Sequence, residues 1–264
     1  MREKRDLIAL SMIQPEPLPG SYRHKDLTIQ NIVDRALLEA EMIAVNGFDG
    51  FILQNMNDMP IKQKAAPEAI AYMTALGYEI KRHFPELIMG ILVNWDGVAA
   101  VAVADAVGAD FARVEHLFTG AEVTSAGILQ AQCCEIAEIR KRMKSKIPVY
   151  ADVQEVHGVP LGAKPIQEAA WEAVHEAFAD GLFMSGATME KSIQMAKEVR
   201  GKVPEVPLYL GGGATGENVC ELLQYYDGVS VATWIKNGNM KNPIDPEKAK
   251  QFMEEVKKAK GLSR

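Results

Sequence analysis

The stretch Gly47-Phe48-Asp49-Gly50-Phe51-Ile52-Leu53-Gln54 is an aspartate–glycine pair followed by a short apolar run that ends in an amide side chain. Short apolar runs of this kind, bounded by turn residues, predict buried β-strands. An acidic residue beside glycine or alanine precedes three further runs, at Ala109-Asp110, Asp180-Gly181 and Asp227-Gly228. The strands between them are preceded instead by proline, at Pro85, Pro148, and Pro204 with Pro207. This two-unit alternation is typical of a barrel whose core layers are filled by alternate strands.

Eight strand-like runs alternate with helical patterns along the whole chain. We expect strands at residues 7–13, 50–54, 87–93, 110–115, 147–153, 181–185, 206–211 and 228–233. We expect helices at residues 29–45, 68–83, 97–107, 128–144, 167–178, 190–200, 217–225 and 246–259. No Pro/Gly/Ser linker interrupts the units, so the sequence predicts one α/β domain over residues 1–264, a (β/α)8 TIM barrel. An open doubly wound sheet is the alternative, and eight parallel strands in this length favour the barrel.

Composition narrows the class of protein. The 264 residues are 48% hydrophobic, which is enough for a large core, and the formal net charge is −6. Acidic and basic residues are interspersed, whereas a nucleic-acid surface needs a basic patch. The longest apolar stretch, residues 98–104, is far shorter than the roughly 20 residues of a membrane span. Three cysteines without a CxxC motif indicate a reducing compartment, so we expect a cytoplasmic protein. The sequence leaves open whether the protein forms a homo-oligomer.

Polar residues follow most of the expected strands, at the end of a barrel where catalytic and binding residues lie. The candidates for substrate binding are Gln14, Gln54, Asn55, Asp58, Asn94, Asp96, Gln154 and Ser185. Arg113 and Glu115 share one face of a strand because side chains two apart point the same way. If they point inward they need partners, either each other or Asp152. An ion pair that plugs the barrel mouth and a role in ligand binding are equally open.

The proposed catalytic set is His157, Asp152, Glu115 and Arg113. His157 follows an acidic strand end, which favours it as general acid or base, and His116 is the second choice. The carboxylates Asp58, Asp96, Glu115 and Asp152 could hold Mg²⁺ through oxygen ligands, although nothing in their spacing selects a metal.

A glycine run predicts a phosphate site. Gly211, Gly212 and Gly213 follow the seventh strand and precede a helix expected to begin near Thr215, and Thr233 follows the eighth strand. Unobstructed amides at this end of a barrel commonly hold a phosphate, to which Lys236 would add charge from the rim. The alternative is a sharp turn that simply needs glycine.

The chain resembles the BtpA/SgcQ family. The resemblance rests on PLPG at residues 17–20, GFDG at 47–50, NMND at 55–58, GADFAR at 108–113, TG at 119–120, ADV at 151–153, His157, PLG at 160–162 and NPIDP at 242–246. It implies a phosphate-binding barrel of the ribulose-phosphate-binding type. Family members have been associated with photosystem I biogenesis and with sugar-related operons.

The sequence departs from the family pattern at polar positions. Gln14 stands where the resemblance implies histidine, Gln54 where it implies glutamate, and Val156 where it implies lysine. Residues 124–127 and 154–155 depart as well. Glutamine keeps its hydrogen bonds but cannot exchange protons near neutral pH. Either the substrate differs from that of typical members, or the typical chemistry is lost.

The sequence leads to two alternative hypotheses about function. The leading hypothesis is an enzyme that acts on a phosphorylated sugar or nucleotide-like metabolite by acid–base chemistry of isomerase, lyase or hydrolase type. A Schiff-base aldolase is disfavoured because no lysine lies at a strand end. The alternative is a non-catalytic barrel that binds a ligand or partner and assists assembly of another complex.

Overall fold

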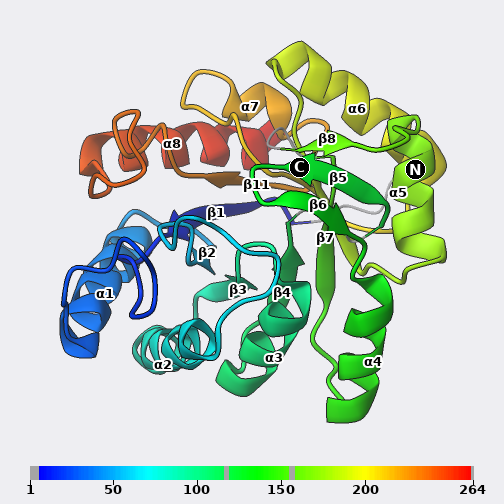
Figure 1. The fold of residues 1–264 in the computed structure, drawn as a ribbon. Coiled ribbons are helices and arrows are strands. Elements are labelled where there is room, and N and C mark those ends of the chain that lie inside the picture. Colours follow the sequence, from blue (N-terminus) through cyan, green and yellow to red (C-terminus); the bar gives the residue numbers. More distant parts are fainter. Residues whose placement is uncertain (1–5, 116–118, 155–157, 263–264) are drawn as a thin grey trace.

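Eight parallel strands close into a barrel in the computed structural model, which describes residues 6–115, 119–154 and 158–262 (Figure 1). The barrel strands are β1 (Ile8–Ile13), β2 (Gly50–Gln54), β3 (Ile88–Leu92), β4 (Phe111–Val114), β7 (Val149–Gln154), β9 (Gly181–Met184), β10 (Leu208–Leu210) and β11 (Gly228–Val231). Each pairs in parallel with the next, and β11 returns to β1. The predicted TIM barrel is therefore confirmed, with all eight strands where the sequence places them.

Helices surround the barrel, one after each barrel strand (Figure 1). They are α1 (Ile29–Val45), α2 (Pro67–His83), α3 (Gly97–Val107), α4 (Cys133–Met143), α5 (Ile166–His175), α6 (Met189–Lys202), α7 (Val219–Leu222) and α8 (Pro246–Leu262). None of the helices in the described part of the chain is long and apolar enough to cross a membrane.

The expected helix at residues 128–144 is wrong at its start. Residues Gly127–Gln130 form β6, which pairs with β5 (Ala121–Thr124), and β5 pairs in turn with β8 (Val159–Pro160). Gly127 turns the hairpin with a φ of 97°, a conformation that glycine adopts without strain. This antiparallel sheet joins the loop after β4 to the loop after β7, and the helix begins only at Cys133.

Four aspartates hold the amino ends of the barrel strands together. Asp49, just before β2, donates its backbone N–H to the Ala9 carbonyl at 3.0 Å. Its carboxylate accepts the N–H of the same Ala9 at 2.7 Å. The same two hydrogen bonds recur at three other aspartates, each with a single residue of the preceding barrel strand. They join Asp110 to Met89, Asp180 to Val149 and Asp227 to Leu208. Each carboxylate also pairs with a basic side chain, from Lys260, Lys81, Arg140 and Arg200 respectively.

Glycines and aromatic rings fill the lower barrel interior. A Cβ on Gly181 or Gly228 would lie 2.7 or 2.4 Å from the ring of Tyr150 or Tyr209, so only glycine leaves room there. The rings of Phe111, Tyr150, Phe183 and Tyr209 form a contiguous cluster with centroids 4.9 to 6.3 Å apart. This cluster fills the barrel interior on the amino-terminal side, and polar side chains lie at the carboxyl ends of the strands.

The aspartates should differ in their contribution to stability according to burial. Asp227 has 2% of its side chain exposed and Asp110 has 46%, although both accept the same kind of backbone bond. We expect Asp227→Ala to lower the free energy of unfolding by about 3–5 kcal/mol, since it leaves Arg200 without its buried partner. Asp110→Ala, the matched control, should cost only about 1 kcal/mol. Urea denaturation of both variants checks this, and equal losses would contradict it.

Candidate functional site

Arg113 and Asp152 form a buried ion pair at the carboxyl end of the barrel. Arg113 Nε donates to Asp152 Oδ2 and Nη2 donates to Oδ1, both at 3.0 Å. Only 3% and 2% of the two side chains are exposed. The guanidinium carbon lies 4.3 Å from the centroid of the Phe183 ring, a cation–π contact. Of the two partners considered for Arg113, the structure pairs it with Asp152.

Gly211 lies directly against this pair. A Cβ there would be 3.0 Å from Arg113 Nη2 and 3.6 Å from Asp152 Oδ1. The Gly211 N–H donates to the Met184 carbonyl at 3.0 Å within the sheet, so that amide is already used. Of the three glycines predicted to hold a phosphate, Gly211 therefore has no amide to offer, and the prediction rests on Gly212 and Gly213. Ser185 lies close by, its Oγ 3.8 Å from where a Gly212 Cβ would stand.

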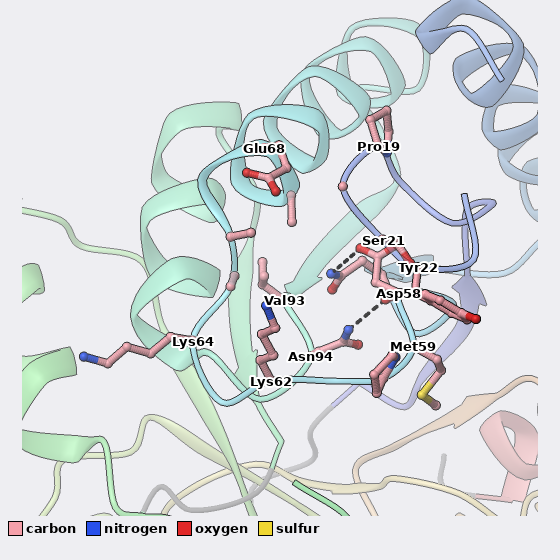
Figure 2. A pocket seen from close by; sticks show the side chains of 16 residues that line it. Pro19, Ser21, Tyr22, Asp58, Met59, Lys62, Lys64, Glu68, Val93 and Asn94 are labelled. Carbon is pink, nitrogen blue, oxygen red and sulfur yellow. Dashed lines mark hydrogen bonds between the residues drawn. The ribbon is translucent and has the colours of Figure 1, made fainter. Parts of the chain in front are cut away.

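Asn55, Asp58 and Asn94 lie beside the mouth, where they line a cavity next to α2 (Figure 2). Asp58 accepts the Leu18 N–H at 2.7 Å and the Asn55 side-chain amide at 2.9 Å. Burial raises the pKa of Asp58, and these hydrogen bonds oppose the rise. The sequence placed these residues in one ring with Gln54, but Asn55 is the next residue and its side chain turns to the other face of β2.

Asp96 has a structural role. It caps α3 by accepting the Ala99 N–H at 2.9 Å, and its second oxygen accepts the Ala65 N–H at 2.8 Å. With Asp58 tied to Leu18 and Asp152 to Arg113, the carboxylates proposed for Mg²⁺ do not gather. Among the described residues there is no group of three or more His, Cys, Asp or Glu that could hold a metal ion.

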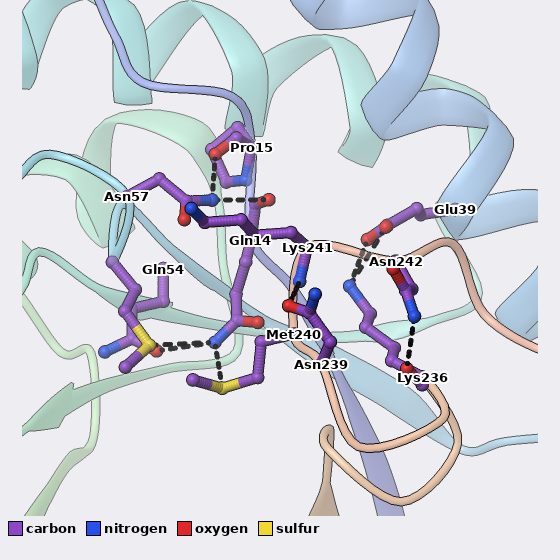
Figure 3. A network of polar contacts seen from close by, with 11 residues as sticks. Gln14, Pro15, Glu39, Gln54, Asn57, Lys236, Asn239, Met240, Lys241 and Asn242 are labelled. Carbon is purple, nitrogen blue, oxygen red and sulfur yellow. Dashed lines mark hydrogen bonds and ion pairs between the residues drawn. The ribbon is translucent and has the colours of Figure 1, made fainter. Parts of the chain in front are cut away.

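A chain of side-chain hydrogen bonds runs from Glu115, just after β4, to Gln14, just after β1, and Figure 3 shows its part at Gln54 and Gln14. Gln54 Nε2 donates to Glu115 Oε2 at 3.2 Å, and Gln14 Nε2 donates to Gln54 Oε1 at 3.4 Å. Gln14 and Gln54 are buried, and Glu115 is half-buried. Gln14 Oε1 has no hydrogen-bond partner among the described residues. The chain of hydrogen bonds thus ends in a buried acceptor at Gln14.

Lys236 does not stand at the rim, which corrects the sequence-based expectation. It is completely buried, and its Nζ donates to Glu39 Oε1 at 2.9 Å and Oε2 at 3.1 Å (Figure 3). Burial raises the pKa of Glu39, and Lys236 opposes that rise. The helix after the glycine run is also shorter than expected, since α7 has four residues and starts at Val219. Thr233 keeps its expected place and is exposed.

His157 and the second choice His116 lie outside the described residues, as does the side chain of Gln154. Conversely, the sequence did not single out Glu39 or Phe183. Phe183 carried a signal, because it stands two residues before Ser185 on one strand and therefore shares its face.

Comparison with known proteins identifies the family. The model of the BtpA family matches residues 4–258. The chain belongs to the BtpA family. A Synechocystis protein named photosystem I biogenesis protein BtpA is 30% identical over 250 residues, covering 93% of this chain and 86% of that one. An uncharacterized protein of Thermococcus kodakarensis is 32% identical and covers 99% and 98% of the two chains.

Several solved structures are similar in fold to this BtpA-family chain. A structure of native KDPGal covers 98% of each chain with a TM-score of 0.61 and 13% identity. N-(5'-phosphoribosyl)anthranilate isomerase from Pyrococcus furiosus covers 96% of this chain and 99% of its own, with a TM-score of 0.56 and 14% identity. At such identities the likeness establishes the fold alone.

The Arg113–Asp152 pair of this BtpA-family barrel should stabilise the fold less than its geometry suggests. We expect Asp152→Leu to cost about 3–5 kcal/mol because it leaves a buried guanidinium without its counter-charge. The double variant Arg113→Met/Asp152→Leu removes both charges and should unfold within about 1–2 kcal/mol of the wild type. Urea denaturation midpoints measure both. A double variant as unstable as the single one would mean that the pair holds the barrel together.

Proposed function

We propose that this BtpA-family barrel is an enzyme that acts on a small phosphorylated sugar or nucleotide-like metabolite by acid–base chemistry. The buried Arg113–Asp152 pair carries the proposal. Aliphatic side chains normally fill a barrel interior at this depth, and burying two charges costs more than burying such side chains. A buried pair at the carboxyl end, packed against a glycine whose Cβ would crowd it, is therefore better explained by ligand binding than by stability.

Each side chain around the mouth has a role in this proposal. Arg113 orients the substrate, while Asp152 and Glu115 supply the carboxylates for proton transfer together with His157, whose role rests on the sequence alone. Gln14 and Gln54 cannot exchange protons near neutral pH, so they position the substrate and Glu115. The reaction class is an isomerisation, a lyase reaction or a hydrolysis.

The phosphate group belongs at the loops after β10 and β11 in this proposal. Gly212 is partly open, Gly213 is exposed with a φ of 81°, and neither would place a Cβ closer than 3.8 Å to another residue. Ser185 and Thr233 add hydroxyl groups from the neighbouring strand ends. Backbone amides and hydroxyls suffice to hold a phosphate in a protein of negative net charge.

A second function is a binding scaffold that assists assembly of another complex. The name of the Synechocystis relative favours it, as do the glutamines at positions where the family resemblance implies titratable groups. The two functions differ in what they need from the barrel mouth. An enzyme must bind and convert a small molecule there, whereas a scaffold need not.

Ligand-dependent melting with product detection tests the proposal. Wild-type protein is melted against a panel of sugar phosphates and nucleotides, and the hits are incubated and followed by ³¹P NMR. A hit at 100 times its Kd stabilises the fold by about 2.7 kcal/mol. We expect at least one hit to be converted by the wild type and neither bound nor converted by Arg113→Met/Asp152→Leu. A panel without hits, or hits that bind both proteins equally, would exclude this site.

The anion position has its own test. Gly212→Asp places a carboxylate where the phosphate should lie, and it should abolish binding of the phosphorylated hit while the fold survives, since there is room for a Cβ. Gly201→Asp adds the same charge at an open position at the end of α6 and should leave affinity within about twofold. Isothermal titration calorimetry of both variants decides. Unchanged affinity in Gly212→Asp would refute the position.

A further inference from the structure

The antiparallel sheet formed by β5, β6 and β8 is apolar on both of its faces (Figure 1). Its inner face is covered, because Leu129 of β6 is buried and packs against Trp95. Neighbouring residues of a strand point to opposite faces, so Ile128 points outward. Val123 lies directly opposite Ile128 in the register of the sheet and therefore points outward with it.

The outer face carries a continuous apolar patch across all three strands. Val123 lies opposite Ile128 on one side and opposite Val159 of β8 on the other. Leu161 is two residues beyond Val159 and shares its face, and the Leu161 N–H donates to the Ala121 carbonyl at 2.8 Å. The exposed fractions of Val123, Ile128, Val159 and Leu161 are 43%, 62%, 68% and 50%. Because side chains at opposed positions touch, these four form one patch and not scattered exposures.

This pattern is the reverse of the one that a solvated sheet face shows. An antiparallel sheet with one face in water alternates apolar residues inward with polar residues outward. In β5 the charged residue, Glu122, is buried on the inner face, and the apolar Val123 is exposed on the outer one. Glu122 is also the single charged residue within residues 119–130 and 158–163. The outer face thus has the composition of an interface core, which is depleted of charge.

A second copy of the chain is the partner that this face fits best. A patch without charge provides no electrostatic selection of a different protein. Two such faces meet without repulsion, although each chain carries a net charge of −6. The ridge at Val123 lies beside the smaller Ala121, two residues away on the same face, so a two-fold rotation places the ridge of one copy over the dip of the other. A face that contacts its own image closes at two subunits.

We propose that the chain forms a symmetric dimer through the outer faces of its β5–β6–β8 sheets. The contact is centred on Val123 and covers Ile128, Val159 and Leu161 of both copies. A standard interface takes about 800 Å² and about 20–30 residues from each partner, and this sheet offers fewer residues. The dimer is therefore weak, with a Kd on the order of 10 µM. The proposal does not depend on catalysis at the barrel mouth, since it rests on other residues.

Sedimentation equilibrium from roughly 2 to 200 µM, a range that brackets the expected Kd, tests the proposal. The mass of the wild type should rise from that of a monomer toward that of a dimer. Ile128→Lys places like charges on the two apposed faces and should raise the Kd about tenfold or more. Its melting temperature should stay unchanged, because Ile128 is exposed. Val45→Lys is the matched control, since Val45 is 70% exposed at the end of α1, outside the sheet, and its Kd should stay within about twofold of the wild type.

A second measurement locates the contact. In a ¹H–¹³C spectrum of the wild type, the methyl resonances of Val123, Ile128, Val159 and Leu161 should shift over the same concentration range, while those of Val45 stay fixed. The proposal is overturned if the wild type remains a monomer at the highest concentration, if Ile128→Lys dimerises like the wild type, or if a different set of methyl groups responds. A monomer in which these four residues respond to a ligand of the barrel mouth, or to another protein, would overturn it as well, because the face would then have a different occupant.

Discussion

The register of the barrel depends on one repeated contact, in which an aspartate before a strand forms two hydrogen bonds with a single residue of the preceding barrel strand. Asp49 with Ala9 is one case, and Asp110, Asp180 and Asp227 are the others. A slip of one residue would turn every inward side chain outward. Because the contact uses both the backbone N–H and the carboxylate, it allows a single pairing. The four contacts therefore decide which side chains face the interior of the barrel.

That constraint determines the composition of the mouth. On β4 the inward positions run Phe111, Arg113, Glu115, and on β7 they run Tyr150, Asp152. The aromatic cluster thus lies one layer below the charges and keeps that layer dry, which strengthens the attraction between Arg113 and Asp152. Gly211 follows Tyr209 on the same face of β10, and the absence of a side chain there leaves room for the pair. Rigid strands, rather than loops, position the charges proposed to bind the substrate.

The sequence predicted what short-range signals encode. Aspartate–glycine pairs mark the strands, and alternation along β4 brings Arg113 and Glu115 to one face. The sequence could not predict contacts between distant segments, such as the ion pair between Lys236 and Glu39, which lie 197 residues apart. The β5–β6 hairpin was missed because Ile128 and Leu129 fit a helical period equally well. The capping role of Asp96 was missed although its position before Gly97 carries a capping signal, because a strand end and a helix start coincide there.

The amide chain explains how a departure from the family pattern affects the proposed chemistry. An amide N–H needs an acceptor, so Gln54 directs its nitrogen to Glu115 and its oxygen to Gln14. The Gln14 oxygen is then left buried, without a hydrogen-bond partner among the described residues. The orientation of both glutamines therefore follows from one carboxylate. Titratable groups at these two positions would compete with Glu115 for protons, whereas amides cannot. In this chain Glu115 is the titratable member of the row, and the glutamines convert two strand ends into fixed hydrogen-bonding groups. At the ends of β1 and β2, the mouth is therefore suited to binding neutral hydroxyl groups of a substrate rather than to exchanging protons with it.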